Sequence, residues 1–311
     1  MSVPSHAKSV AFSGYGDADV LRLTESPVPE PGPGQVLLRV RAVGVNPLDW
    51  KVRRGFMEAV FPVAFPHVPG LEASGVVAAV GADVTAWKPG DEVLGPVAGG
   101  YAEYALADAA KLAAKPADLG WEAAAALPVA AESATRALGA LGLVPGETLL
   151  VHAAAGSVGS LTVQLAVAAG VTVVGTASEA NHDHLRALGA IPVRYGEGQF
   201  DRIRAAAPQG VDAVLDAAGS GVLAESVALA GGPERVVSLV DPAEAGPLGV
   251  RFSGGGPGED RTVEGLAGAL ALHRAETLAL PVRAALPLAD AASAHRLSEQ
   301  GHGLGKIVLL P

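Results

Sequence analysis

The chain has 311 residues and a net charge of −10; half of its residues are hydrophobic and none is cysteine, and the length suggests about two domains. The acidic balance argues against nucleic acid as the main partner, because phosphate backbones are bound by basic surfaces. The lack of cysteine excludes disulfides, thiolate nucleophiles and metal sites with cysteine ligands.

The first third of the chain is expected to form short strands separated by turn residues. Residues Ser26–Gly34 are rich in proline and glycine and predict a rigid turn. Strand-like runs lie around this turn, at Ser9–Phe12, Gln35–Val45, Leu71–Val80, Asp91–Gly95 and Tyr101–Ala107. Short strands at such spacing, with glycine and proline between them, are typical of a small β-rich domain.

After Trp121 the pattern changes to alternating helices and strands. An alanine-rich stretch around Pro128, Glu122–Leu141, predicts one or two helices. Strands are expected at Thr148–His152, Val171–Thr176, Val211–Leu215 and Arg235–Leu239, and helices at Ser157–Ala169, Ala180–Leu188, Val263–Ala275 and Ala289–Glu299. This alternation predicts an α/β fold with a doubly wound parallel sheet. The final strand, Lys306–Leu310, has no partner in the alternation, so we expect it to return to the first domain.

Neither a signal peptide nor a membrane span is predicted. The N-terminus lacks the apolar stretch of about 7–15 residues that a signal peptide needs. No uninterrupted apolar run reaches the roughly 18 residues of a spanning helix, since Gln164 and Gly170 interrupt the longest candidate. The sequence therefore predicts a cytoplasmic protein without a membrane partner.

The most informative motif lies between Leu149 and Gly170. An apolar strand leads into Ala154-x-Gly156-x-x-Gly159 and then a helix, which is the dinucleotide fingerprint with alanine in its first position. Gly156 lets the backbone approach a pyrophosphate, and Gly159 lets helix and strand pack closely. The first helical N–H groups and the helix dipole then face the phosphates. The alternative is a purely structural turn, but the order of strand, turn, helix and next strand favours a cofactor.

The end of the second strand favours NADPH over NADH. An NAD site usually has an acidic residue about 20 residues after the motif, whereas no acid precedes Glu179 here. The hydroxyls of Thr176 and Ser178 are candidates to bond a 2′-phosphate. Further candidate donors follow along the chain: Asn181, Arg186 and Arg194. Alternatively, Ser178 caps the helix that begins near Ala180, and the two roles can coexist.

Several further segments occur in the order expected of one family. They are Pro33–Gly55, His67–Gly81, Trp87–Val93, Gly99–Ala107, Ala125–Ala134, Val151–Gly159 and Gly305–Leu310. Together they resemble the zeta-crystallin-type quinone oxidoreductases of the medium-chain dehydrogenase/reductase superfamily, over essentially the whole chain. The resemblance implies a GroES-like substrate domain formed by residues 1–121 and 277–311. It also implies a Rossmann domain inserted at residues 122–276, and usually a homodimer.

The resemblance also implies that no metal takes part. Alcohol dehydrogenases of the superfamily hold catalytic zinc with cysteine and histidine, and a four-cysteine lobe holds a second zinc. The matching positions here are Asn46, Leu71 and Ala130–Ala131, and the lobe is missing. A substitute site built from His67, Asp49 and Glu72 is an alternative, but zinc needs three or four converging ligands.

Two residues are the candidate catalytic groups. Without metal or thiol, the protein must place the nicotinamide against an electron-poor acceptor and stabilise the charge that develops. The resemblance places Asn46 in the substrate pocket, where its amide donates to a carbonyl oxygen; alternatively, it fixes the turn before Pro47. Lys51 matches a position that is tyrosine in some quinone oxidoreductases and lysine in related enone reductases. It either bonds the nicotinamide half and stabilises an enolate or is a solvated helix lysine.

Asp49 is expected to hold Lys51 or the local backbone.

Other candidates come from the Rossmann side. Ser157 and Val158 match the phosphate-binding turn, and Tyr195 matches a position near the adenosine unless it only packs. The loops after the fourth and fifth strands carry the remaining candidates, which are Ala217, Gly219, Ser238, Leu239 and Val240. Leu304 replaces an arginine that relatives often carry before Gly305, so one expected phosphate contact is missing.

The leading functional prediction is NADPH-dependent, metal-independent hydride transfer to a quinone or another α,β-unsaturated carbonyl compound. One alternative is an enone or enoyl-thioester reductase of a biosynthetic pathway, which Lys51 favours. The other is an NADPH-binding regulatory or structural protein without turnover, which Met57 favours because some relatives have tyrosine there.

Overall fold

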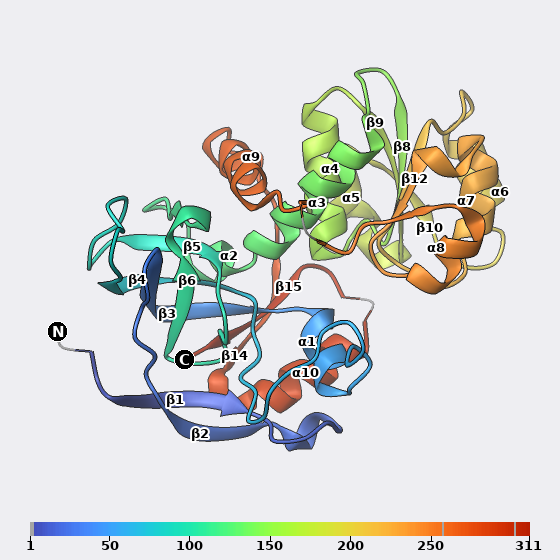
Figure 1. Cartoon of the computed structure of the whole chain (residues 1–311). Coiled ribbons are helices and arrows are strands. Elements are labelled where there is room, and N and C mark those ends of the chain that lie inside the picture. Colours follow the sequence, from blue (N-terminus) through green and yellow to red (C-terminus); the bar gives the residue numbers. More distant parts are fainter. Residues whose placement is uncertain (1–2, 257, 302) are drawn as a thin grey trace. The chain divides into compact units, whose positions relative to one another are not determined.

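The chain folds into two compact units in a computed structural model that describes residues 3–256, 258–301 and 303–311 (Figure 1). The first unit consists of Met1–Val129, Pro281–Gly301 and Lys306–Pro311. The second consists of Ala130–Leu280 and His302–Gly305. The predicted fold class, a GroES-like unit together with a Rossmann-like parallel α/β unit, is confirmed.

The first unit is built on a large mixed sheet with the strand order β14-β15-β3-β4-β5-β7, and β6 pairs with β3. Its strands are β3 (Gln35–Val45), β4 (Glu72–Val80), β5 (Glu92–Pro96), β6 (Tyr104–Asp108), β7 (Ala113–Ala114), β14 (Val282–Pro287) and β15 (Lys306–Leu310). A separate sheet joins β1 (His6–Ala11) and β2 (Arg22–Pro27). The helices are α1 (Pro47–Arg53), α2 (Trp121–Ala125) and α10 (Ala291–Glu299), with short 3-10 turns at Ala18–Val20, Ala109–Lys111 and Leu288–Asp290.

Strand β3 is an inner strand of the large sheet in the first unit. Val36, Leu38 and Val40 alternate along it into one hydrophobic core, and Leu37 between them is buried as well. The C-terminal strand β15 pairs antiparallel with β3 and parallel with β14. The expectation that the last strand returns to the first domain is therefore confirmed.

The second unit is a doubly wound parallel sheet with the order β10-β9-β8-β11-β12-β13. Its strands are β8 (Thr148–His152), β9 (Thr172–Ala177), β10 (Ile191–Arg194), β11 (Ala213–Asp216), β12 (Val236–Ser238) and β13 (Arg251–Phe252). Its helices are α3 (Pro128–Leu141), which starts at the boundary, α4 (Ser157–Ala168), α5 (His182–Ala187), α6 (Gln199–Ala206), α7 (Leu223–Ala230), α8 (Pro242–Leu248) and α9 (Thr262–Arg274), with 3-10 turns at Glu179–Asn181 and Pro233–Arg235. Ligands bind such sheets beyond the carboxyl ends of the strands, where the strand order reverses.

Both faces of this parallel sheet are covered. On β8, Leu149 and Val151 belong to one hydrophobic core, whereas Leu150 belongs to the other. Strands buried on both sides are apolar throughout, which is why β8 was predicted within its observed bounds.

Several elements differ from the sequence prediction. Strands β2, β10, β13 and β14 were not predicted, and β2 is solvent-exposed along most of its length, so it lacks the apolar alternation that marks a strand. The helix expected at Ala180–Leu188 is a 3-10 turn followed by α5, and β6 begins at Tyr104 because Tyr101 turns into the core.

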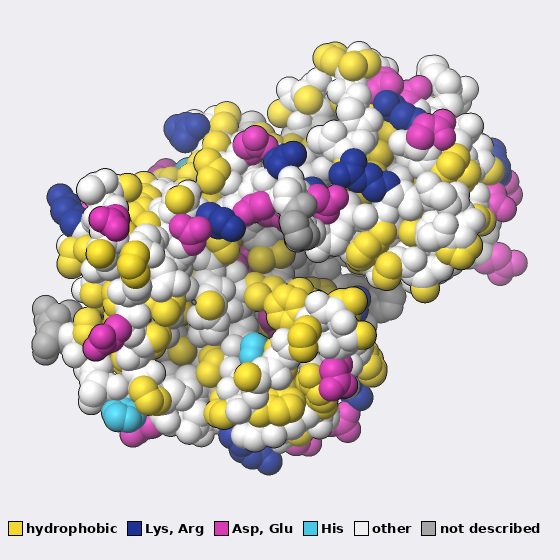
Figure 2. All heavy atoms as spheres, in the orientation of Figure 1, with side chains coloured by type: hydrophobic (Ala, Val, Ile, Leu, Met, Phe, Trp, Pro, Cys, Tyr) yellow, Lys and Arg dark blue, Asp and Glu magenta, His cyan; other side chains and the backbone are white. Residues whose placement is uncertain are grey.

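The molecular surface is mixed in charge. On the face that Figure 2 shows, lysine and arginine side chains are scattered among acidic ones and form no large basic patch. Within the described part of the chain, no helix combines the length and hydropathy that crossing a bilayer requires.

Candidate active site

The turn between β8 and α4 has an open position in front of the helix. A Cβ at Gly159 would lie 2.3 Å from the carbonyl oxygen of Ala153, so close packing requires this glycine. A Cβ at Gly156 would meet its nearest neighbour only at 3.4 Å, and the backbone there has φ −71°. Packing within the protein therefore tolerates a Cβ at position 156 far better than at position 159.

The backbone N–H groups of this turn lie at the start of α4. The N–H of Ser160 is the first to bond within α4, donating to the carbonyl of Gly156 at 2.7 Å. The amides of Ser157, Val158 and Gly159 precede it, at the positive end of a helix of 12 residues. Ala154, in the first position of the motif, is fully buried and donates to the carbonyl of Thr176 at 3.0 Å. Backbone N–H groups at a helix N-terminus are the kind of group that binds anions, so the predicted role of this turn stays a prediction.

At the end of β9, Thr176 and Ser178 have different surroundings, although the sequence analysis proposed the same role for both. Thr176 is buried, and its hydroxyl accepts from the N–H of Ala153 at 3.2 Å, so it supports the turn from inside. Ser178 is partly exposed and occupies the N-cap position of the 3-10 turn, but its side chain makes no capping bond. Glu179 pairs with Arg194 at 3.4 Å on the surface. The hydroxyl of Ser178 thus remains available to a ligand.

Two loops at the carboxyl ends of β11 and β12 are tied together by Asp216. This carboxylate is fully buried and accepts from the N–H groups of Ala218 and Gly219, both at 2.9 Å. It also accepts from the hydroxyl of Ser238 at 2.8 Å. Sequence reasoning missed Asp216, although an acidic residue at the end of an apolar strand is the signal that could have found it.

The remaining candidate residues of the second unit differ in how exposed their side chains are. Ser238 is buried, and its hydroxyl accepts from the N–H of Val240 at 3.3 Å, so it organises its own loop. The N–H of Leu239 donates to the carbonyl of Asp216 at 2.9 Å. Ala217 and Asn181 are partly buried, and Tyr195 follows β10 with 40% of its surface exposed.

A buried polar cluster in the first unit holds Asn46. The ammonium of Lys306 donates to Oδ1 of Asn46 at 2.6 Å and pairs with Glu72, and Nδ2 of Asn46 donates to Oε1 of Glu72 at 2.8 Å. All three side chains are at most 5% exposed. The amide of Asn46 was expected to donate to a substrate, but here it is directed at Glu72, because a buried ion pair needs hydrogen bonds to its remaining lone pairs.

Lys51 and Asp49, neighbours on α1, do not pair. The ammonium of Lys51 lies 5.9 Å from the ring centroid of Trp50, and the side chain is partly exposed. Asp49 instead accepts from the N–H of Asn46 at 2.8 Å and from the hydroxyl of Tyr101 at 3.2 Å. The expectation that Asp49 holds Lys51 is wrong, whereas its expected bond to the local backbone is present.

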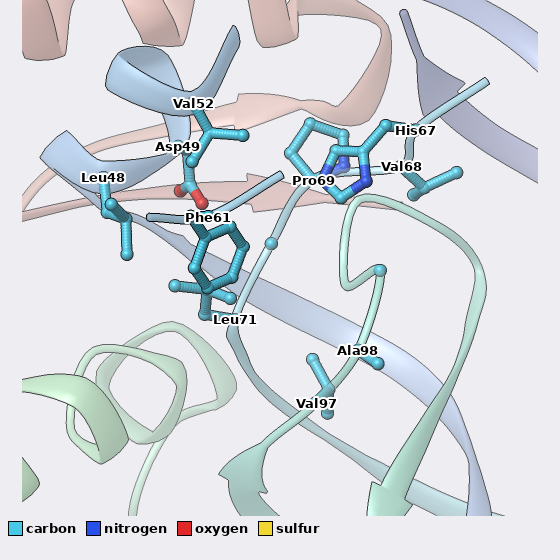
Figure 3. A pocket seen from close by; sticks show the side chains of 12 residues that line it. Leu48, Asp49, Val52, Phe61, His67, Val68, Pro69, Leu71, Val97 and Ala98 are labelled. Carbon is cyan, nitrogen blue, oxygen red and sulfur yellow. The ribbon is translucent and has the colours of Figure 1, made fainter. Parts of the chain in front are cut away.

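A cavity of about 210 Å³ opens beside α1 within the first unit (Figure 3). Its lining is mostly apolar and consists of Leu48, Asp49, Val52, Phe61, His67–Leu71 and Val97–Gly99. Burial raises the pKa of the Asp49 carboxyl from 3.8 to about 6, and burial lowers the pKa of His67. The cavity therefore suits an apolar molecule with one polar group.

Metal ligands do not gather at this cavity. In the parts of the chain that the structure describes, no three histidine, cysteine, aspartate or glutamate side chains converge to hold an ion. Glu72, one member of the alternative zinc set, is bonded to Lys306 and Asn46 instead.

His152, at the end of β8, is buried. Only 1% of its surface is exposed, and its Nε2 lies 3.0 Å from the hydroxyl of Ser226. Burial lowers its pKa to about 4, so it is a neutral core residue.

Two family models match the chain. The alcohol dehydrogenase GroES-like domain matches residues 32–117, and the zinc-binding dehydrogenase model matches residues 188–309. The first match lies in the first unit, and most of the second lies in the Rossmann-like unit.

The curated relatives of the chain include proteins that are named as oxidoreductases or reductases. The chain is 33% identical to an NADPH-dependent alkenal/one oxidoreductase of *Arabidopsis thaliana* over all of its own length and 81% of the relative's. It is 35% identical to a 2-methylene-furan-3-one reductase of *Solanum lycopersicum*, covering 81% of this chain but 66% of that protein. A spectinabilin polyketide synthase system protein of *Streptomyces orinoci* is 38% identical over 96% of this chain, which spans 14% of that protein.

Solved structures agree over nearly the whole chain. The quinone oxidoreductase of *Coxiella burnetii* superposes with a TM-score of 0.86 and 31% identity, covering 98% of this chain and 99% of that one. A mycobacterial protein in complex with NADPH gives a TM-score of 0.84 and 32% identity, covering 98% of this chain and 100% of that one. The chain therefore belongs to the medium-chain dehydrogenase/reductase superfamily, among its quinone oxidoreductases and alkenal/enone reductases.

Proposed function

We propose that this oxidoreductase uses NADPH to reduce a quinone or another α,β-unsaturated carbonyl compound without a metal. The observation that carries the proposal is the open turn at Gly156 in front of α4, which fits the diphosphate of a dinucleotide. The NADPH-dependent relative and the NADPH-bound neighbour support the choice of cofactor. Metal independence rests on the lack of cysteine and on Asn46 and Leu71 at the positions that match zinc ligands.

The cofactor would be held mainly by backbone groups. The amides of Ser157, Val158 and Gly159 face the diphosphate, next to Ala154 and Gly156. Ser178 and Asn181 bind the 2′-phosphate, Thr176 supports them from inside, and Tyr195 lies against the adenosine. The loops anchored on Asp216 hold the nicotinamide half, through Ala217, Gly219, Ser238, Leu239 and Val240. The bound dinucleotide supplies the hydride.

The acceptor would occupy the apolar cavity beside α1. A conjugated carbonyl compound has an apolar body and one polar oxygen, which matches this lining. Lys51 contributes positive charge near the developing anion, and Asn46 either fixes the wall of the site or turns toward the acceptor.

The resemblance also favours a homodimer in the cytoplasm. Light scattering on the purified chain would test the oligomeric state, and localisation of a tagged chain would test the compartment.

The test is a binding and turnover experiment on the purified chain. We expect quenching of protein fluorescence on titration with NADPH, and oxidation of NADPH with some members of a panel of quinones and enones. Failure to bind NADPH would refute the proposal. Binding without turnover on the whole panel would favour the alternative of a regulatory or structural protein.

Enoyl-thioester reduction is the second candidate. It is favoured by the polyketide synthase relative, which matches 96% of this chain. The same assay with a crotonyl thioester of N-acetylcysteamine separates the two candidates. A kcat/KM for the thioester far above those for quinones and simple enones would favour the second.

A further inference from the structure

Asp49 is held in the cavity wall by a buried chain of hydrogen bonds. The N–H of Asn46 and the hydroxyl of Tyr101 both donate to the same carboxyl oxygen, Oδ2, at 2.8 Å and 3.2 Å. The hydroxyl of Tyr101 lies 3.0 Å from Nε2 of His295 on α10, and both of these side chains are fully buried. Figure 3 shows the Asp49 carboxyl among the side chains that line the cavity.

This arrangement fixes where hydrogens lie. Because Tyr101 gives its hydroxyl hydrogen to Asp49, its oxygen accepts from Nε2 of His295, which is the neutral tautomer with hydrogen on Nε2. Burial lowers the pKa of His295 to about 3, in keeping with a neutral ring. In the described part of the chain, both bonds that the Asp49 carboxyl accepts fall on Oδ2. A proton bound to Asp49 therefore sits on Oδ1.

The surroundings keep this carboxyl partly protonated near neutral pH. Burial is the largest cause of its raised pKa of about 6, and Glu72 on β4 raises that pKa further. The bond from the N–H of Asn46, the charge of Lys306 on β15 and the bond from Tyr101 lower that pKa, without cancelling the effect of burial. Arg53 on α1 is paired with Glu299. Across the cavity, His67 has a pKa lowered by burial, and it adds no positive charge near neutral pH.

We propose that Asp49 is the acid that protonates the reduced acceptor in this cavity, with Tyr101 and His295 as its positioning residues. The inference rests on the proposed function. When the β-carbon of an enone takes a hydride, the electrons of the C=C bond move to the carbonyl oxygen and form an enolate. The O–H bond on Oδ1 breaks, and its proton goes to the enolate oxygen, which gives an enol that tautomerises to the saturated ketone in water. Asp49 is left as a carboxylate and regains a proton from water after the product leaves.

The first test is the pH dependence of turnover with cyclohexenone. A group that must be protonated gives a kcat that falls about tenfold per pH unit above its pKa, so we expect a decline above about pH 6. Tyr101→Phe removes a bond that lowers the pKa of Asp49, so its decline should begin at higher pH. Asp49→Asn should be at least tenfold slower and flat over this range. Asp83→Asn, at an exposed turn, should behave as the parent chain.

Tyr101→Phe keeps the carboxyl, so the test survives if Asp49→Asn does not fold. An unshifted decline in Tyr101→Phe, or the parent profile retained in Asp49→Asn, would overturn the proposal.

The second test needs no turnover and separates this proposal from the proposed function. Protonated Asp49 can donate to a carbonyl oxygen, so cyclohexanone should bind several-fold tighter at about pH 5.5 than at about pH 8 by calorimetry. Asp49→Asn should lose this dependence. If the dependence is present but no acceptor oxidises NADPH, the proposed function fails, and what stands is only that protonated Asp49 donates a hydrogen bond in this cavity. If acceptors turn over but cyclohexanone binding is independent of pH, the acid fails alone.

Discussion

Gly156 and Gly159 occupy one turn but lack side chains for different reasons. At Gly159 the neighbouring backbone leaves no room, since a Cβ would lie 2.3 Å from an oxygen of the protein. At Gly156 a Cβ would lie 3.4 Å from its nearest neighbour, so packing alone does not demand a glycine, and the proposed diphosphate in front of the helix would account for it. At the scale of single residues, this contrast separates a packing requirement from a binding requirement.

We expect Gly156→Ala to weaken NADPH binding by at least about tenfold, because its methyl group occupies space meant for the diphosphate. Loss of the favoured N-cap glycine should cost less than about 1 kcal/mol of stability. Gly159→Ala should instead destabilise the fold by about 1–3 kcal/mol, because the clashing backbone must move. Fluorescence titration and urea unfolding measure the two effects. Gly139→Ala, in an open position, is the control, and equal effects at 156 and 139 would contradict the assignment.

Ser178 provides a test of cofactor choice at the same scale. Ser178→Asp should weaken NADPH binding by at least about tenfold and NADH binding much less, because a carboxylate repels a 2′-phosphate but not a hydroxyl. Dissociation constants for both cofactors are the measurement, with Ser178→Asn as an uncharged control. Equal affinities for the two cofactors in the parent chain would refute the preference.

At the scale of elements, the ion pair of Lys306 and Glu72 joins β15 to β4, and Asn46 adds the start of α1. Lys306→Ala should destabilise the chain by about 3–5 kcal/mol, because it leaves a buried carboxylate without its counter-ion. Urea unfolding measures the loss, with the exposed Lys88→Ala as the control. The double variant Lys306→Met with Glu72→Gln should be more stable than Lys306→Ala. A loss below about 1 kcal/mol in Lys306→Ala would show that the pair is not important for stability.

The sequence predicted those elements whose pattern of residues lies within one short stretch of the chain. The strand β3 and the turn after β8 were found because their patterns lie in one short stretch. Strand β2 escaped notice because its exposed side chains show no apolar alternation. The hydrogen-bonded chain at Asp49 could not be predicted, because its members are far apart in the sequence. Tyr101 lies 52 positions after Asp49, and His295, the partner of Tyr101, lies 194 positions after Tyr101. Only the folded sheet brings these residues together.

At the scale of the whole molecule, the proposed chemistry requires neither a metal nor a thiol. We expect dialysis against EDTA to leave NADPH oxidation within about twofold of its starting rate, because no step depends on a Lewis acid. Added zinc should restore nothing, and iodoacetamide should not inhibit, since the chain has no cysteine. The rate of absorbance loss at 340 nm measures each effect. Complete loss of activity on chelation, recovered by zinc, would refute metal independence.

The placement of β15 between β14 and β3 has a consequence for synthesis on the ribosome. All strands of the parallel sheet are complete once Phe252 has emerged, whereas the mixed sheet still lacks an inner strand until Leu310 has followed. A nascent chain can therefore form the parallel sheet first. Until residue 310 has been added, the edge of β3 that pairs with β15 keeps unpaired backbone N–H and C=O groups. At this stage the nascent chain is most prone to pair with another chain and has most need of a chaperone.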